Sequence, residues 1–257
     1  MMKTKKSWFV IALAVILSGS MAGCIGEGSN SRDFSAIPSY VTMSDGKVGL
    51  KTLVGNVYAS GLSYDQLDAF GIAWFNINYD QQPAGTDGVK VPYTATMNAW
   101  LPVPSGYIRT ESGEIPGYYN DTIFSASVFY SQLLNNHAFF VMDENAPSNR
   151  KYTYYLTFNT DSTTKYGTPM LYMQTEITDS GSGSVVESLD CPYAFNMSSL
   201  MHSSYAKDST VDNIECSVVR FNLYYQSGVE KTTNKPIFRA SSNNPQLILV
   251  PKDNSEY

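Results

Sequence analysis

KYTYYLTFN, residues 151–159, decides the fold class because its side chains alternate in character with a period of two. Successive side chains of an extended strand point to opposite faces of a sheet. One face of this stretch carries the apolar and aromatic side chains Tyr152, Tyr154, Leu156 and Phe158. The other face is mostly polar. The pattern predicts a strand with one dry and one partly wet face, which is typical of antiparallel sheets.

Two more stretches, IAWFNINY at residues 72–79 and SVVRFNLYYQ at residues 217–226, alternate in the same way. Further strands are expected at Val48–Tyr58, Val91–Met97, Ala138–Met142, Thr168–Ile177, Pro236–Arg239 and Gln246–Val250. The 19 tyrosines and 12 phenylalanines of the chain suit this interpretation, since aromatic side chains favour half-buried pleated surfaces.

Helical signals are few and short. Ser63 to Gln66 has the form of a capping box and predicts a two-turn helix that ends at Phe70. A second short helix is expected within Asn196–Tyr205, and Ser125–Leu134 fits either a helix or a strand. The sequence therefore predicts an all-β protein with few short helices.

The segment Trp100–Tyr119 is rich in Pro and Gly and has no period, so a domain boundary is expected there. This divides the chain into a small N-terminal β domain at residues 38–105 and a larger antiparallel β-sandwich at residues 119–257.

The N-terminus has the order of a secretory signal peptide: three lysines, the apolar run Trp8–Leu17, then small residues. That run is about half the length that a membrane-spanning helix needs. Met21-Ala22-Gly23-Cys24 resembles the bacterial lipobox, which implies cleavage after residue 23 and a lipid on Cys24. The alternative is an ordinary signal peptide cleaved nearby, with Cys24 free.

Residues 24–37 are rich in Gly, Ser and Asn and predict a flexible tether. In the enterobacterial scheme an Asp after the lipidated cysteine marks inner-membrane retention, and its absence here favours the outer membrane. No lysine followed by an acidic run is present, so the periplasmic leaflet is favoured over the cell surface.

The whole chain has 17 basic and 23 acidic residues, and three lysines belong to the signal peptide. The remaining 14 basic residues against 23 acidic ones give a net charge near −9. Such a chain repels phosphates, so no nucleic-acid partner is expected.

The lipobox, GIAWFNINYD with VPYTATM, and the later YTYYLTFN, FNMSSL and SVVRFNLYYQ together resemble the NigD-like lipoproteins of Bacteroidales. This resemblance implies an OB-like N-terminal barrel, a C-terminal β-sandwich and no assigned enzymatic activity. One departure is that many such proteins carry an acidic run after the lipidated cysteine, which IGEGSN lacks. Glycan-binding and fimbrial-anchor lipoproteins of Bacteroidales remain alternatives.

Catalytic and metal signatures are lacking in the sequence. The two histidines, His137 and His202, form no HxH or HExxH pattern, and no GxSxG is present. Asp143-Glu144-Asn145 could hold calcium, but a solvated turn is the favoured interpretation. A pair of carboxylates for glycoside hydrolysis is left open, because such a pair need not be close in sequence. We expect no enzyme, no cofactor and no metal.

Trp74, on the mixed face of its strand, and Trp100, in the boundary segment, are candidates for stacking against a sugar ring. The alternative is that they fill ordinary sheet surface. Asp-Ser/Thr motifs that resemble the Bacteroidales O-glycosylation acceptor occur at Thr122, Ser162 and Ser209.

Cys191 and Cys216 remain after lipidation, and an oxidising compartment favours a disulfide between them. Two separate buried thiols are the alternative. The function expected from these observations is that of a cell-envelope lipoprotein without enzymatic activity, bound to the outer membrane by its lipid and acting through contacts with an envelope protein. A glycan-binding surface lipoprotein is the alternative, and a hydrolase is a distant third.

Overall fold

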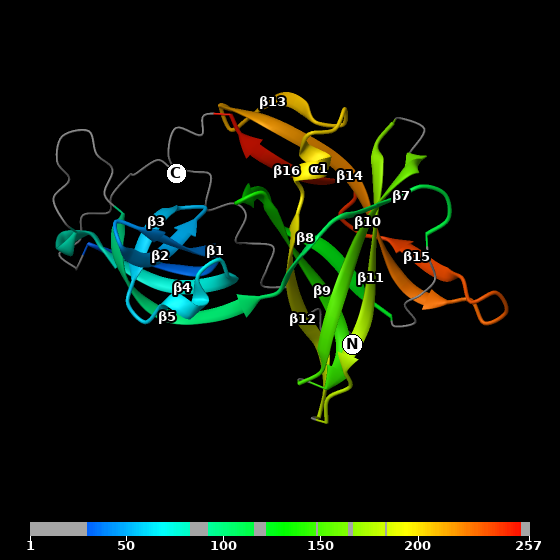
Figure 1. The fold of residues 1–257 in the computed structure, drawn as a ribbon, viewed down its shortest axis with the longest axis horizontal. Coiled ribbons are helices and arrows are strands. Elements are labelled where there is room, and N and C mark those ends of the chain that lie inside the picture. The colour runs from blue at the N-terminus through cyan, green and yellow to red at the C-terminus, as the bar shows by residue number, and fades with distance from the viewer. Residues whose placement is uncertain are drawn as a thin grey trace, which may run out of the picture.

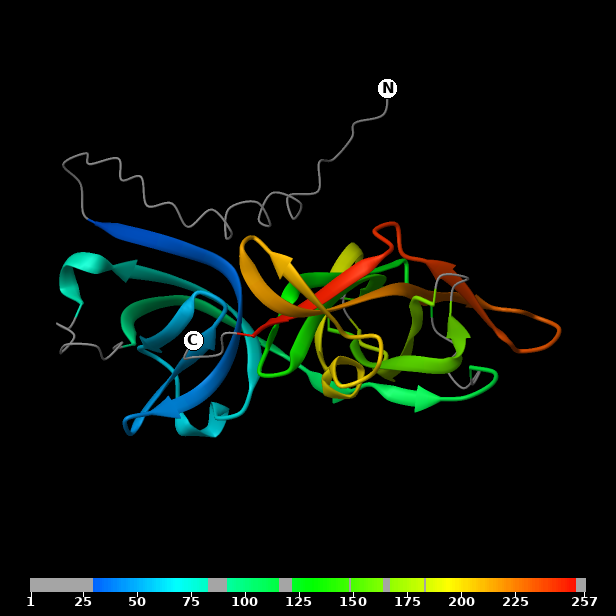
Figure 2. The same cartoon turned by 90° about the horizontal axis from the view of Figure 1, so that it is seen from above.

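The computed structural model describes residues 30–82, 92–115, 122–147, 149–163, 167–182 and 184–252. The fold is nearly all β and has two parts, a small barrel and a larger curled sheet, which lie side by side along the longest axis (Figures 1 and 2). No helix in the described ranges is long and apolar enough to cross a membrane.

Five strands form the barrel: β1 (Ser31–Ser44), β2 (Lys47–Thr52), β3 (Gly55–Ala59), β4 (Phe70–Asn78) and β5 (Tyr93–Val103). They close in the order β1-β2-β3-β5-β4, with β3 parallel to β5. A closed five-stranded barrel of this connectivity is the OB-like barrel that the resemblance implies. Two 3-10 turns accompany it, η2 (Tyr64–Gln66) and η3 (Tyr79–Gln81).

The larger sheet contains β6 (Ser105–Tyr107), β7 (Arg109–Glu111), β8 (Ser125–Leu134), β9 (His137–Pro147), β10 (Lys151–Thr163), β11 (Pro169–Asp179), β12 (Val185–Asn196), β13 (Lys207–Val211), β14 (Ile214–Val229), β15 (Pro236–Ala240) and β16 (Gln246–Pro251). Its main path is β6-β12-β9-β8-β16-β14-β11-β10-β7, and β13 and β15 each pair with β14. The sheet curls into two facing layers, so the expected sandwich is one continuous sheet folded over. It is mixed rather than purely antiparallel, because β7, β11, β16 and β6 each join a parallel pair.

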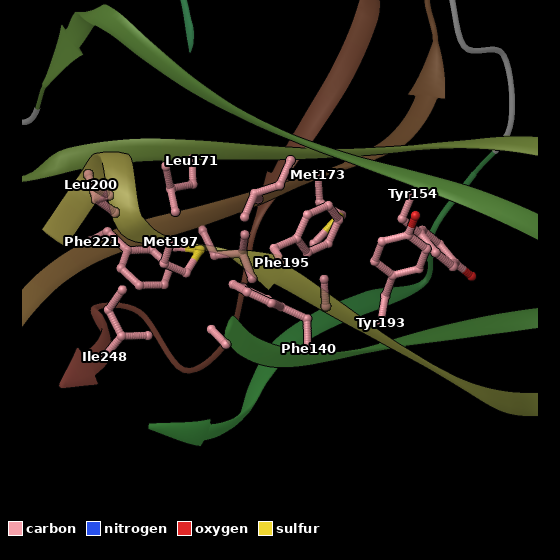
Figure 3. Close-up of a cluster of buried hydrophobic side chains, with 14 of the residues drawn as sticks. Phe140, Tyr154, Leu171, Met173, Tyr193, Phe195, Met197, Leu200, Phe221 and Ile248 are labelled. Atoms are coloured by element: carbon pink, nitrogen blue, oxygen red, sulfur yellow. The ribbon is translucent and has the colours of Figure 1, made fainter. Parts of the chain in front are cut away.

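The core of the larger sheet lies between its two layers and is rich in aromatic rings (Figure 3). Phe140, Phe195 and Phe221 are fully buried, and their ring centroids lie 5.7 Å (Phe140–Phe195) and 6.4 Å (Phe140–Phe221) apart. The short helix α1 (Ser198–Met201) packs on this core through Leu200. Burial of this inner face explains the alternation in residues 151–159 and 217–226.

The barrel and the sheet share a third apolar cluster. Phe70, Ile72 and Val103 of the barrel pack there with Leu134, Phe139 and Ala194 of the sheet. The Tyr130 hydroxyl of the sheet also donates a hydrogen bond to the Ala36 carbonyl of β1, 3.1 Å away. The two parts are therefore held together by buried apolar surface and not only by the chain.

The structure corrects the expected tether. Strand β1 starts at Ser31, so residues 31–37 belong to the barrel. Phe34 and Ile37 are buried in the barrel core, where the Phe34 ring stacks on Phe75 at 5.0 Å. A bulge between Phe34 and Ile37 places both side chains inward although they are three positions apart.

Other local expectations also change. The two-turn helix after Ser63 is only the 3-10 turn η2, because Leu67 is already non-helical, with a ψ of 142°, and Asp68 follows with a φ of 65°. Residues 48–58 form two strands, since the Thr52 hydroxyl bonds the Gly55 carbonyl (2.7 Å) and closes a turn. Ser125–Leu134 is a strand. The expected boundary segment instead contains the end of β5 and the short strands β6 and β7.

Candidate functional site

The outer face of β10, β11, β14 and β15 carries an aromatic platform, which consists of Tyr155, Tyr172, Tyr224 and Phe238. Tyr172 stacks on Tyr224 with ring centroids 5.4 Å apart, and its edge meets Phe238 at 4.9 Å. Each of the four side chains is half-buried, so each ring keeps some surface in contact with solvent. The platform lies in the part of the sheet farthest from the barrel (Figure 1).

Strand alternation explains why these rings point outward. Their neighbours Leu156, Leu171 and Leu223 are fully buried in the core between the two layers. Arg109 of β7 lies over the ring of Tyr155, with its guanidinium carbon 3.9 Å from the ring centroid. The Tyr155 hydroxyl also donates to Glu176 Oε2 at 2.7 Å. The platform is therefore built from Tyr, Phe and Arg, the residue types that enrich protein interfaces.

The two candidate tryptophans do not converge on one surface. Trp74 lines an open hollow of about 510 Å³ on the barrel, together with Asp33, Ser35 and Asn98. Trp100 lies in β5, not in a boundary loop, and packs against the barrel core. Its ring covers Gly71, where a Cβ atom would lie only 2.3 Å from the ring. Trp100 is thus a packing residue. Trp74 packs against the cluster shared by barrel and sheet but also lines the hollow, so it alone stays a candidate for stacking.

The predicted disulfide between Cys191 and Cys216 is not formed, and both residues carry thiols. Cys191 packs against the core between the layers, whereas Cys216 belongs to a separate cluster with Val218 and Leu249 on the outer face. Their strands are also separated by β9, β8 and β16 in the sheet. Two cysteines on opposite faces of non-adjacent strands cannot reach the Cα separation of a disulfide.

Asp143 and Glu144 lie within strand β9, so they form neither the expected solvated turn nor a calcium loop. Glu144 is 2% exposed and accepts a hydrogen bond from the Tyr154 hydroxyl at 3.1 Å. Burial raises the pKa of Asp190, and it raises the pKa of the neighbouring Cys191 thiol to about 11. A thiol with this pKa is protonated near neutral pH and is a poor nucleophile. In the described ranges, no group of three His, Cys, Asp or Glu could hold a metal ion.

His137 and His202 do not belong to a common site. His137 opens β9 at the interface between barrel and sheet, where its ring centroid lies 4.1 Å from that of Phe70. Burial there lowers the pKa of His137. His202 ends α1 and is exposed.

The remaining predicted sites can be placed only in part. Cys24 lies outside the described residues, as does the side chain of Ser162. Thr122 is half-buried and Ser209 is exposed on β13, so Ser209 is the more accessible acceptor of the two. The sequence reasoning missed the aromatic platform, because its four rings come from strands that only the sheet register brings together.

Comparison with known proteins supports the fold. No protein-family model matches the sequence, and no curated protein matches it significantly. The chain is similar to the structure of an uncharacterized protein from Parabacteroides merdae, with 13% identity, a TM-score of 0.61, and coverage of 85% of this chain and 98% of that chain. It is also similar to a NigD-like immunity protein from Bacteroides caccae, with 10% identity, a TM-score of 0.49 and coverage of 86% and 98%. The solved structures to which the chain is similar therefore include that of a NigD-like protein.

Proposed function

We propose that this chain is a cell-envelope lipoprotein without enzymatic activity, and that it binds a protein partner through the aromatic platform. The observation that carries the proposal is the concentration of Tyr155, Tyr172, Tyr224 and Phe238 on one half-exposed sheet face. Aromatic rings supply large contact areas at low cost in conformational entropy, and they dominate the binding energy of many interfaces.

A photo-crosslinking amino acid at position 224 tests the platform directly. In cells of the source bacterium, we expect one adduct of discrete mass that is at least tenfold stronger than with the same probe at Lys231, an exposed position in the β14–β15 turn. Tyr172→Ala should reduce the adduct at least tenfold. Equal labelling at positions 224 and 231, or no adduct at either, would contradict the proposal.

The proposal places the protein at the outer membrane, held by lipid on Cys24 and with the periplasmic leaflet as the expected side. The sequence Met21-Ala22-Gly23-Cys24 supports this anchor. Two or more acyl chains hold a protein where one chain does not. Cys24→Ala should abolish labelling by a palmitate analogue and release the protein from membranes, whereas Cys191→Ala should do neither. A Cys24→Ala variant that stays labelled would show that the lipid is elsewhere.

Glycan binding at the Trp74 hollow is the second candidate function. The hollow combines a half-buried indole with the polar side chains of Asp33 and Asn98, which is the mixture that sugar rings require. On a glycan array, Trp74→Ala should lose any signal that the Trp100→Ala variant retains, since Trp100 packs on the barrel core. An array without a Trp74-dependent signal would exclude this function.

A further inference from the structure

The outer face of β13, β14 and β16 is apolar along most of its length and cationic at one border. The strand register puts Ser209, Cys216 and Pro251 in one row and Lys207, Val218 and Leu249 in the next. Directly opposite residues of paired strands share a face, with Cβ atoms about 4.5–5.5 Å apart. We call this face the amphipathic trough.

An apolar cavity of about 230 Å³ occupies the end of the trough near the β13–β14 turn. Ile214 and Leu249 line it, Tyr130 of β8 and Leu53 of the barrel complete its walls, and none of its lining residues is charged. The cavity lies where β8 and β16 are joined by a single pair, Leu249 opposite Gln132. An apolar cavity of about 150 Å³ stays dry and takes up benzene, so this larger one is suited to an apolar group.

A second hollow, of about 530 Å³, adjoins the trough at its cationic border and is lined by Lys207, Arg220 and Ser209. Neither Lys207 nor Arg220 forms an ion pair within the described part of the chain. The hollow is also lined by the carboxylate of Asp208, which is ion-paired with Lys252, with Nζ 2.7 Å from Oδ2. Two cations that have no ion-pair partner within the described part of the chain favour an anion bound at this hollow, against the net negative charge of the whole chain.

The two hollows adjoin each other across the β13–β14 pair. Ser209 of the cationic hollow lies directly opposite Cys216 of the apolar cavity. Cys216 and Arg220 are four positions apart on one face of β14, which corresponds to about 13 Å along a strand. A ligand that used both hollows would have an apolar part and an anionic part separated by roughly this length.

We infer that the amphipathic trough binds a single-chain amphiphile, with its acyl chain in the apolar cavity and its anionic head at Lys207 and Arg220. A peptide of similar length fits less well, because its backbone amides would lie over Cys216, Val218 and Leu249 without hydrogen-bond partners. An acyl chain has no polar groups along its length. The trough lies on the same outer face of β14 as the aromatic platform but nearer the start of the strand, and it consists of different residues, so the inference does not rest on the proposed protein partner.

Calorimetric titration with dodecanoate tests the inference, using the chain from residue 24 onward with Cys24→Ser and ligand concentrations below micelle formation. We expect one dodecanoate per chain and at least tenfold weaker binding of dodecyltrimethylammonium, which has the same chain and the opposite charge. Lauroyl lysophosphatidylglycerol carries the same chemistry on a lipid headgroup. If it binds more tightly than dodecanoate, the natural source is a membrane lipid, and the reverse result indicates a free fatty acid.

Variants locate the site. The double variant Lys207→Gln/Arg220→Gln should weaken dodecanoate binding at least tenfold, whereas Lys151→Gln/Lys231→Gln, which removes the same charge elsewhere, should leave it unchanged. Leu249→Trp should fill the cavity and abolish binding. Ile214→Asn, at a side chain that is 41% exposed, gives a second test at a position that tolerates polarity, with folding checked by circular dichroism. No dodecanoate binding, equal binding of the cationic amphiphile, or binding that all these variants retain would overturn the inference.

Discussion

The barrel and the larger sheet solve the problem of strand edges in different ways. The barrel closes on itself, so each of its five strands has two neighbours. The larger sheet ends in β6 and β7, which are only three residues long, and its edge strands β13 and β15 each pair on one side with β14. Because the barrel is closed, its inner core is small, and part of its outer surface packs against the sheet. The open sheet gains broad outer faces.

This difference indicates that the barrel and the sheet have different roles. The barrel uses its outer face to hold the sheet, through Phe70, Ile72 and Val103. The outer surface of the sheet carries the aromatic platform and the amphipathic trough. The barrel is therefore expected to act as a support whose stability depends on its contact with the sheet.

The largest effect is expected from a substitution that disrupts the contact between the barrel and the sheet. Phe139 is 1% exposed in the cluster between barrel and sheet, and Phe139→Ala should lower the free energy of unfolding by about 3–5 kcal/mol. Apart from Trp8, which lies outside the described residues, both tryptophans lie in the barrel, so fluorescence reports on the barrel and circular dichroism mainly on the sheet. The two urea unfolding curves should coincide in the unmodified chain and separate in Phe139→Ala.

A milder change inside the barrel serves as its control. Ile77→Val should cost about 0.5–1.5 kcal/mol and shift both unfolding curves together, because Ile77 lies in the barrel core and leaves the interface intact. Coincident curves in Phe139→Ala would show that the interface does not couple the two parts.

A second prediction concerns packing within the barrel. The Trp100 ring covers Gly71 so closely that an added Cβ would lie 2.3 Å from it. Gly71→Ala should therefore destabilise the protein by about 1–3 kcal/mol through overpacking. In a Trp100→Ala background the same substitution should cost much less, and a double-mutant cycle of chemical denaturation measures the difference. Additive costs would contradict this contact.

A third prediction concerns how the stability of the interface between barrel and sheet depends on pH. Burial against Phe70 lowers the pKa of His137 below its ordinary value of 6.5. Between the lowered pKa and 6.5 the folded state binds fewer protons than the unfolded state. The stability that His137 contributes is thus complete above pH 6.5 and is lost as the pH falls toward its folded pKa. Denaturation midpoints at pH 5 to 7 should show this slope, and His137→Gln should remove it while His202→Gln retains it.

The smallest effects are expected from substitutions in two hairpin turns, one in the barrel and one in the sheet. Asp45-Gly46 joins β1 to β2 in the barrel, and Asn135-Asn136 joins β8 to β9 in the sheet; all four residues have positive φ. Glycine adopts this conformation without a Cβ penalty, so Asn136→Gly should stabilise the protein by about 0.5 kcal/mol. Gly46→Asn should destabilise it by a similar amount, and thermal unfolding of the two variants tests both signs.

Residues 72–79, 151–159 and 217–226 could be identified as strands because one face of each is buried against a core. Strand β1 could not, since the bulge between Phe34 and Ile37 interrupts its period. Strand β12 was not predicted, because Pro192 lacks a backbone N–H donor and is unusual within a strand. That donor is dispensable here, because β6 pairs with β12 only at residues 194–196.

The candidate sites were less predictable than the strands. The rings of the aromatic platform are up to 83 positions apart in the chain, from Tyr155 to Phe238, and only the register places them together. For the cysteines, alternation already placed Cys216 on the face of Val218 and Arg220, opposite to that of Phe221. Parity along β14 therefore argues against the disulfide, whereas the prediction rested on the compartment and the number of cysteines alone.

Strand β16 has a consequence for the timing of folding. Its residues 246–251 lie between β8 and β14, in the middle of the sheet, and β8 was completed more than a hundred positions earlier. The sheet cannot close until this stretch has emerged from the ribosome or from an export channel. The lipid anchor proposed above requires export of an unfolded chain, and this late central strand would keep such a chain from folding prematurely.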